Sequence, residues 1–407
     1  MDSGSVAWML TASALVLFMT PGLAFFYGGL ARSRNVVSTI MLSFMSMAVV
    51  SVVWVLWGYS IAFGEGGPLF GDLSLIGLRG IGFDDVLDGT EIPVLLFVVF
   101  QMMFAIITPA LITGAIVERF KFTTYLVFLV IWVTVVYAPI AHWVWAGEGW
   151  LFKAGTLDFA GGTVVHINAG VAAVAAALLL GKRRNPGVAP GNVPYVVIGA
   201  AILWFGWFGF NAGSGLAANG LAVNAFLVTN TAAAAAALTW GVLSLIQNKG
   251  RMSAVGVATG AVAGLVAITP ASGYVGVMGA LVIGFGAGVF CYVALLLMAR
   301  TKLDDALAVF AVHGIGGIWG ALATGIFAVA AFGNSDGGLI NGNAGQMLTQ
   351  LIAVVATMGY SFVATLIILK VLDVIPGLGL RAAERDEDLG LDLAAHGERA
   401  FVSDGAD

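Results

Sequence analysis

The sequence predicts an all-α polytopic membrane protein with eleven transmembrane helices. Of its 407 residues, 60% are hydrophobic and only 10% are charged, a composition that excludes an ordinary soluble domain. The apolar runs between polar breaks are long enough to cross a hydrocarbon layer of about 30 Å. The basic residues concentrate in alternate breaks, which is typical of a chain that crosses a membrane repeatedly.

The apolar runs define the predicted helices in order. The N-terminus lacks a charged region, and the first run is too long for a signal peptide, so it is the first span. The eleven predicted spans are residues 5–30, 36–63, 92–117, 123–142, 161–180, 194–217, 224–246, 252–268, 275–299, 309–331 and 347–372. Residues 1–375 form the predicted transmembrane domain, and residues 376–407 form a cytoplasmic tail.

The basic residues predict the orientation of these spans. With the N-terminus outside, only Arg79 and Lys153 fall on the outer face, and the other 15 of the 17 basic residues face the cytoplasm. The positive-inside rule therefore predicts a multi-pass protein of the cytoplasmic membrane, with its C-terminus in the cytoplasm. The formal net charge of −5 argues against a nucleic-acid partner.

Two histidines lie inside predicted spans, and each follows an aspartate by eight residues: Asp158 precedes His166, and Asp305 precedes His313. Eight helical residues rise about 12 Å, which predicts that both histidines lie near the middle of the membrane. Because the two spans run in opposite directions, the pattern predicts an inverted five-plus-five repeat. The repeats would cover about 5–180 and 194–331, with the eleventh helix, 347–372, outside them.

The histidines are predicted to pair with each other. Eight helical residues turn about 80° beyond two full turns, so neither aspartate shares a face with its histidine. Two neutral imidazoles can share one hydrogen bond and still present an edge to a pathway. A metal site and a purely structural bond between helices are the alternatives.

The other polar candidates have simpler interpretations. Asp158 precedes Phe-Ala-Gly-Gly and is expected to cap a helix. Asp304 and Asp305 lie beside basic residues and are expected to form a solvated loop cluster. His142 and His396 are expected to be surface histidines.

Several ordered motifs are more specific. The chain strongly resembles the Amt branch of the Amt/Mep/Rh ammonium transporter family over nearly its whole length. The segments that carry the resemblance are Pro21-Gly22 with Phe26-Tyr27-Gly28-Gly29, Gly114-Ala-Ile-Val-Glu118-Arg119, Asp158-Phe-Ala-Gly-Gly-Thr-Val-Val-His166-Ile-Asn168, Trp207-Phe-Gly-Phe210-Asn-Ala-Gly-Ser214, Val312-His313-Gly314, and Gly390-Leu-Asp392 with His396-Gly397-Glu398.

The resemblance implies a homotrimer with one narrow hydrophobic pore in each subunit, no cofactor and no enzymatic activity. It also implies site residues. These are His166 and His313 in the pore; Phe104 and Phe210 as the gate; Trp145, Phe104, Ser214 and Phe100 for substrate recruitment; and Asp158, Trp207 and Asp305 in supporting roles.

Ammonium is the expected substrate, with methylammonium as its analogue. A cation over aromatic faces gains about 0.5 to 2 kcal/mol, although Trp143, Trp145 and Trp150 could instead form an interfacial aromatic belt. An unpaired cation in an apolar pore carries an idealised cost of about 20 kcal/mol. We therefore expect ammonium to lose its proton near the gate, and ammonia to pass the histidines.

Two other classes of protein are alternatives. An ammonium sensor would bind the same substrate and signal to a cytoplasmic partner, but only about 35 residues follow the last span. A membrane redox enzyme would need haem-ligand pairs or a cysteine cluster, whereas the chain has one cysteine.

Three features bear on regulation and on departures from the family. Composition alone favours a disordered tail, whereas the resemblance implies a tail that packs on the cytoplasmic face and meets a PII-type signal protein.

Ala308 stands where many relatives carry an acidic residue, which puts a cytoplasmic polar network in doubt. Pro109 lies in the third span near Phe104 and could alter the gate.

Overall fold

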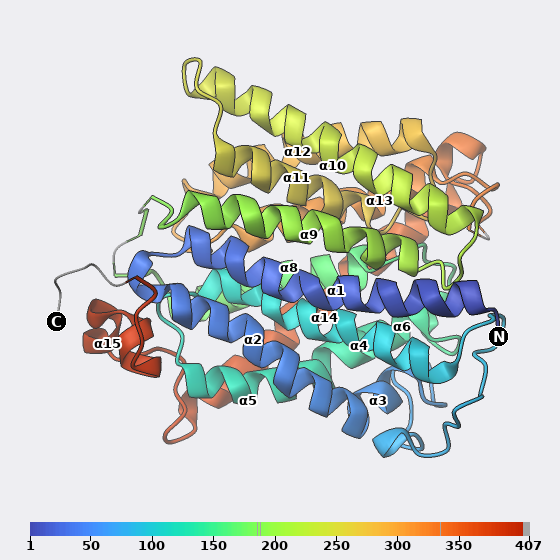
Figure 1. The fold of residues 1–407 in the computed structure, drawn as a ribbon, viewed down its shortest axis with the longest axis horizontal. Coiled ribbons are helices and arrows are strands. Elements are labelled where there is room, and N and C mark those ends of the chain that lie inside the picture. Colours follow the sequence, from blue (N-terminus) through green and yellow to red (C-terminus); the bar gives the residue numbers. More distant parts are fainter. Residues whose placement is uncertain (185, 188, 334, 402–407) are drawn as a thin grey trace.

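The computed structural model describes residues 1–184, 186–187, 189–333 and 335–401, and their regular elements are helices running roughly along one axis (Figure 1). The N-terminus and the tail lie at opposite ends of the bundle, which we call the outer and inner ends after the predicted topology. The elements are α1 (Ser3–Leu30), η1 (Ser33–Asn35), α2 (Val36–Val53), η2 (Trp54–Gly58), α3 (Tyr59–Phe63), η3 (Ile76–Leu78), α4 (Val94–Ile116), α5 (Phe122–Trp132), η4 (Val133–Tyr137), α6 (Ala138–Trp145), α7 (Trp150–Lys153), η5 (Gly162–Ile167), α8 (Asn168–Leu180), α9 (Val193–Gly213), α10 (Gly220–Gln247), α11 (Ala254–Ile268), α12 (Val277–Met298), η6 (Phe310–Gly314), α13 (Ile315–Phe327), η7 (Leu339–Asn341), α14 (Gly345–Val374), α15 (Glu384–Leu389) and η8 (Asp392–His396).

The predicted spans correspond to these helices with some changes at their ends. Ten continuous helical segments among the described residues are long and apolar enough to cross a membrane, and the predicted eighth span is the shorter α11, with 15 residues. The helix predicted for 309–331 ends earlier, at Phe327, and the one predicted for 194–217 ends at Gly213. These boundaries were wrong because the residues that follow are apolar enough to read as helix but form turns.

Polar residues at the start of several helices explain where those helices begin. The side chains of Asp2, Asn192, Asn219 and Ser253 each accept a hydrogen bond from a backbone N–H in the first turn of the helix that follows. Such caps satisfy donors that have no partner inside the helix. Local sequence therefore sets the start of α1, α9, α10 and α11.

Helices α1 and α9, the first helices of the two predicted repeats, approach each other closely along a row of glycines. A Cβ atom on Gly199 would lie 2.2 Å from the backbone nitrogen of Phe26, and one on Gly29 would lie 2.6 Å from that of Val196. Small residues allow such close packing between membrane helices. The contact agrees with an inverted repeat, which otherwise stays a prediction.

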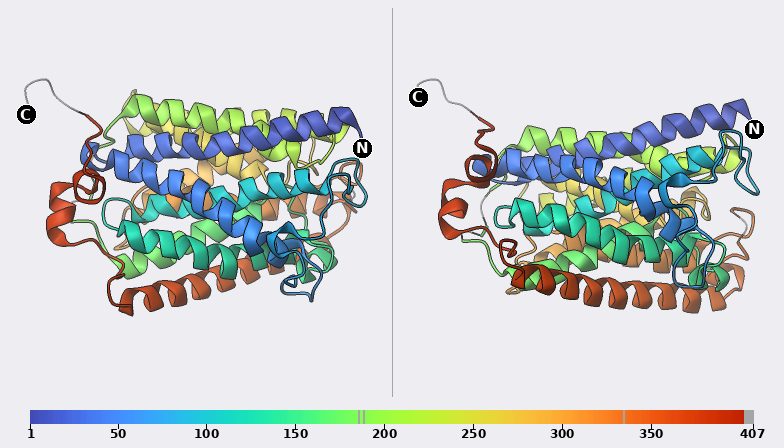
Figure 2. Two further views of the ribbon diagram at one scale, coloured as in Figure 1. Left: turned by 60° about the horizontal axis from the view of Figure 1, so that its bottom comes forward. Right: turned by 90° about the horizontal axis from the view of Figure 1, so that it is seen from below.

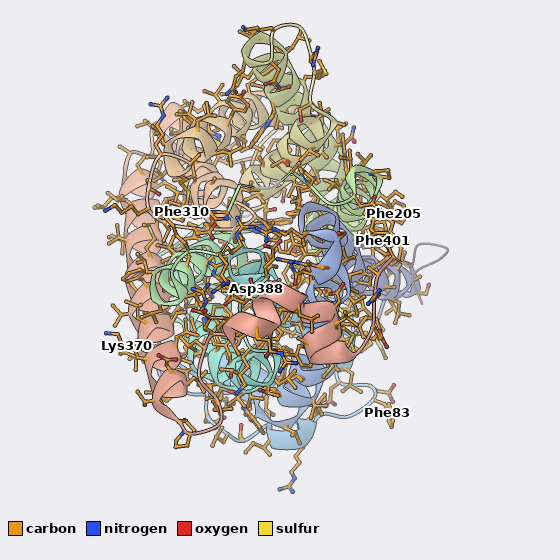
Figure 3. The ribbon with its side chains drawn as sticks, turned by 90° about the vertical axis from the view of Figure 1, so that its left-hand side faces the viewer. Phe83, Phe205, Phe310, Lys370, Asp388 and Phe401 are labelled. Atoms are coloured by element: carbon orange, nitrogen blue, oxygen red, sulfur yellow. The ribbon has the colours of Figure 1, made fainter. Side chains whose placement is uncertain are left out.

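The tail is folded against the inner end of the bundle (Figure 2). Arg34 donates a hydrogen bond to the Asp388 carbonyl (2.7 Å), and Ser38 N donates to the Asp392 carboxylate (2.7 Å). Figure 3 faces this end and shows the tail helix that carries Asp388 lying across the ends of the bundle helices. The expectation of a disordered tail is therefore wrong for residues 376–401, because fixed partners from several helices offset the cost of ordering the chain.

Candidate functional site

His166 and His313 meet inside the bundle. Their Nδ1 atoms are 3.2 Å apart, and the side chains are 1% and 3% exposed. At this distance one imidazole donates a hydrogen bond and the other accepts it. Within the described chain the Nε2 atom of His166 has no hydrogen-bond partner. The structure thus places the pair as predicted and leaves one polar edge available.

Both histidines belong to π-helical turns, η5 and η6, that open the helices continuing as α8 and α13. They lie in the first turn of their helices, and the backbone before each turn is irregular. The depth predicted for the histidines required an unbroken helix from each aspartate to its histidine. That expectation is wrong, because the helices begin at Gly162 and Phe310, after the aspartates. Irregular backbone of this kind is tolerated in a membrane protein only where other protein or a cavity surrounds it.

A close approach of two glycines explains why the histidine-bearing segments meet. A Cβ atom on Gly170 of α8 would lie 2.4 Å from the backbone nitrogen of Gly314 in η6. A side chain at position 170 would push the two helices apart. The segments can therefore converge at the histidines, which the linear sequence could not show.

Asp158 caps the first of these turns, as predicted. Its carboxylate accepts four backbone hydrogen bonds, of 2.7 to 3.1 Å, from Gly161, Gly162, Thr163 and Val164. Burial raises the pKa of Asp158, and the four N–H donors oppose that effect by stabilising the charged form. The carboxylate is therefore committed to holding the start of the helix.

Aromatic rings continue from the histidines toward the outer end. The ring of Phe210 lies 6.0 Å from that of His166 and 4.3 Å from that of Phe104, and the Phe104 ring lies 5.7 Å from that of Trp145. Phe104 and Phe210 are 1% and 0% exposed. The predicted gate residues are thus in contact with each other, and Phe210 is also next to His166.

The rings of Trp145, Phe104, Phe210 and His166 form a continuous file, and two further rings pack against it. Trp207 stacks on His166 at 5.3 Å and donates an indole hydrogen bond to the Thr269 hydroxyl (2.8 Å). Phe100 is 1% exposed and packs edge-on against Phe104. Phe100 therefore supports the gate ring and is not open to the outer surface.

The remaining predicted recruitment residues lie at the outer end of the file. Trp145 is partly exposed, and its indole nitrogen donates to the Asp158 carbonyl (2.9 Å), so it is not an isolated member of an aromatic belt. Ser214 donates its hydroxyl proton to the Phe210 carbonyl (2.9 Å). Its oxygen still offers lone pairs to a donor such as ammonium.

Pro109 lies inside α4, which continues from Val94 to Ile116. One turn before it, the Phe104 carbonyl accepts a hydrogen bond from the Thr108 hydroxyl (2.7 Å). The proline therefore does not break the helix that carries the gate ring.

A cavity of about 540 Å³ lies on the inner side of the histidine pair. Its lining includes Tyr27, Lys182, Asp305, Val312 and His313 of the histidine pair. Tyr27 belongs to one of the family motifs, but the sequence predicted no role for it. It lines the same cavity as His313.

Asp304 and Asp305 do not form the expected solvated loop cluster. The Arg183 guanidinium binds the Asp304 carboxylate (2.9 Å), and Arg119, which is fully buried, donates to the Asp304 carbonyl (2.7 Å). Burial raises the pKa of Asp304, but the bonds from Arg183 outweigh it and lower the pKa below its ordinary value. Burial lowers the pKa of Arg119 to about 10, so it remains charged at neutral pH.

This inner network forms although Ala308 supplies no carboxylate. Glu118, from the loop after α4, lies 3.4 Å from the guanidinium of Arg32 and 3.8 Å from that of Arg183. The doubt raised by Ala308 was therefore misplaced, because the partners come from distant parts of the chain. Ala308 itself has a φ of +60° and lies in a turn.

Asp305 repeats the role of Asp158 at the second π-helical turn. Its carboxylate accepts hydrogen bonds from the backbone nitrogens of Val309 (3.0 Å) and Phe310 (2.7 Å). Burial raises its pKa to about 6, although these bonds and Arg119 oppose the shift. Both histidine-bearing helices thus begin at an aspartate cap.

The raised pKa of Asp305 predicts a pH-dependent contribution to stability. Between about pH 4 and pH 6 the folded protein binds a proton that the unfolded chain does not, so this contribution weakens as pH rises through 6. Relative to Asp305→Asn, the wild-type melting temperature should rise by about 2 °C when the pH falls from 7 to 5. Thermal unfolding in detergent at both pH values measures this, and an unchanged or reversed difference would contradict the assignment.

His142 is not the surface histidine that was predicted. It is 0% exposed, and its two ring nitrogens lie 3.0 Å from the Ala62 carbonyl and 2.8 Å from the Gly67 carbonyl. His396 is partly exposed in the tail and packs edge-on against Phe122. Both contacts join segments far apart in sequence, so no local pattern could reveal them.

The fold and the site together define a class of protein. Apolar helices long enough to cross a membrane, which enclose aromatic rings and two hydrogen-bonded histidines, define a polytopic membrane protein. The sequence profile of the Ammonium Transporter Family matches residues 7–401. The chain belongs to this family and is an ammonium transporter.

Individual relatives agree over the full length. The chain is 47% identical over 406 residues to the ammonium transporter Amt1 of Archaeoglobus fulgidus, covering 99% of this chain and 100% of that protein. It is 47% identical over 405 residues to an ammonium transporter of Bacillus subtilis, covering 98% and 99%. The crystal structure of Saccharomyces cerevisiae Mep2 superposes with a TM-score of 0.91 at 38% identity, covering 100% of this chain and 93% of Mep2. A structure described as a Sensor Amt Protein is similar at a TM-score of 0.86 and 31% identity, covering 97% and 98%.

Proposed function

We propose that the chain recruits ammonium from outside between Trp145, Phe104 and Ser214, that ammonium loses its proton near the phenyl gate, and that ammonia passes His166 and His313. The proton either returns to the outer water or follows along the histidine pair, and the current measurement below distinguishes these two routes. The observation that carries this proposal is the continuous file of rings from Trp145 to the paired histidines. A cation can bind over the outer rings. Deeper in the file, closely packed rings leave no space for a hydration shell.

Electrostatics supports passage of the neutral species. Moving an unpaired cation out of water costs several kcal/mol even after relaxation. The Asp158 carboxylate is occupied by four N–H donors and is not free to accompany a cation. Both histidines also lie at helix N-termini, where the helix dipole is positive and disfavours a further positive charge. Ammonia can instead exchange hydrogen bonds with the imidazole edges.

Selectivity follows from the same chemistry. Potassium matches ammonium in charge but has no proton to release and no hydrogen to donate. A potassium ion would have to cross the gate and the histidine pair as a cation. We therefore expect the pathway to reject it.

The direct test is current measurement on proteoliposomes adsorbed to a solid-supported membrane. Ammonium and potassium pulses of equal concentration are applied to the same sample, and stopped-flow measurement of internal pH gives the flux of neutral ammonia. We expect ammonium-dependent transport with potassium responses no larger than those of empty liposomes. Equal responses to the two ions would contradict deprotonation as the basis of selectivity, and transient charge movement distinguishes electrogenic transport from ammonia conduction.

We further propose that the protein assembles as a homotrimer in the cytoplasmic membrane, with its N-terminus outside. The family resemblance supports the trimer, and the distribution of basic residues supports the orientation. A PII-type signal protein is the proposed partner at the inner end, where the tail is folded against the bundle. The alternative function, an ammonium sensor, would retain ammonium binding but show no flux in the liposome assay.

A further inference from the structure

Gln350 of α14 is a completely buried amide with hydrogen bonds to two other parts of the chain. Its Oε1 atom accepts from the Leu157 backbone nitrogen (2.8 Å), and its Nε2 atom donates to the carbonyls of Leu157 (2.8 Å) and Ala321 (3.0 Å). The side chain is 0% exposed. Gln346, one turn earlier, donates to the same Oε1 atom (3.2 Å).

The first partner of Gln350 is Leu157, which adjoins the aspartate cap of the His166 helix. Leu157 directly precedes Asp158, whose carboxylate caps the turn containing His166. The Asp158 carbonyl also accepts the indole hydrogen bond of Trp145. A shift of the backbone at 157 would therefore move the recruitment tryptophan and the His166 helix together.

The second partner of Gln350 belongs to the second predicted repeat. Ala321 lies on α13, the helix that continues from the turn containing His313. One amide thus joins the outer loop of the first predicted repeat to the His313 helix of the second. It does so from α14, which lies outside both repeats.

We infer that Gln350 is a positioning residue of the transport pathway, which fixes the Trp145–Asp158 segment against the His313 helix. This inference rests on the proposed function of the rings and histidines. An amide suits the position because one end accepts and the other donates. Methionine has a similar length but can satisfy none of the three backbone groups, and a charged glutamate can accept from Leu157 N but cannot donate to the two carbonyls.

A structural bond alone would affect stability without affecting substrate handling, so the test needs a matched control. Thr365 of α14 is also 0% exposed, and its hydroxyl accepts a hydrogen bond from the Trp132 indole (2.9 Å) on α5. Thr365→Val therefore removes a buried contact of the same helix that does not reach the pathway. All the variants are expected to lower the melting temperature, since each leaves buried polar groups unpaired.

The experiment measures ammonium transport by full-length Gln350→Met, Gln350→Glu, Thr365→Val and wild type in proteoliposomes, with half-saturating ammonium concentration and ammonium-to-potassium selectivity as readouts. We expect both Gln350 variants to raise the half-saturating concentration by about tenfold, and Thr365→Val to match wild type. Should Gln350→Met not fold, Gln350→Glu carries the test because it retains one bond. Wild-type affinity and selectivity in the folded Gln350 variants, or an equal shift in Thr365→Val, would overturn the inference while leaving the proposed function intact. Absence of ammonium transport by the wild type would instead overturn the proposed function, and this inference with it.

Discussion

Replacing either pore histidine with alanine is expected to change ammonium transport more than any other single substitution. His166→Ala or His313→Ala removes one half of the 3.2 Å hydrogen bond and leaves its partner buried without it. Flux of ammonium or methylammonium should change by about tenfold or more, because ammonia in passage would lose a hydrogen bond worth about 1 to 1.5 kcal/mol, and about 1.4 kcal/mol corresponds to a factor of ten. Selectivity against potassium should change as well.

The measurement is transport in proteoliposomes, together with size-exclusion analysis to show that each variant still assembles. His142→Ala is the matched control, since it removes an equally buried imidazole whose partners, the carbonyls of Ala62 in α3 and of Gly67, lie outside the file of rings. If both pore variants kept wild-type flux and selectivity, the histidine pair would have no part in the mechanism.

Removal of the Asp158 carboxylate should cause the second large effect. Asp158→Ala loses all four hydrogen bonds to the first π-helical turn, whereas Asp158→Asn retains one acceptor oxygen. A single cap contributes about 1 kcal/mol, and several lost acceptors in a buried site should cost about 2 to 4 kcal/mol. We expect Asp158→Ala to reduce transport strongly and Asp158→Asn to lie between it and wild type.

Thermal unfolding and flux are to be compared with Asp2→Ala, which removes the N-terminal cap of α1 at the outer surface. That variant should lose only about 1 kcal/mol and keep normal transport. Normal flux in Asp158→Ala would show that the cap does not position His166.

The sequence by itself determined the class of protein and most of its spans. Long apolar runs require helices, because a helix satisfies its own backbone hydrogen bonds in lipid. The aspartate cap at position 158 was also predictable, since a cap depends on residues adjacent in the chain. The pairing of His166 with His313 was predicted as well, because helix rotation placed neither aspartate on the same face as its histidine.

Only the tertiary structure decided the features that depend on distant partners. Burial of His142 requires the carbonyls of Ala62 and Gly67, and the inner network joins Glu118, Arg183 and Asp304 from three loops. The tail is ordered by bonds from the Arg34 side chain in η1 and the Ser38 backbone N–H in α2, which the polar composition of the tail does not reveal. The tertiary structure also decided where the histidine-bearing helices begin. The sequence predicted two helical turns between each aspartate and its histidine, but irregular backbone follows each aspartate and the histidines lie in the π-helical turns that open α8 and α13. Gln350 shows the physical reason most clearly: a glutamine in an apolar helix has no predictable partner until folding brings the backbone of Leu157 and Ala321 to its amide.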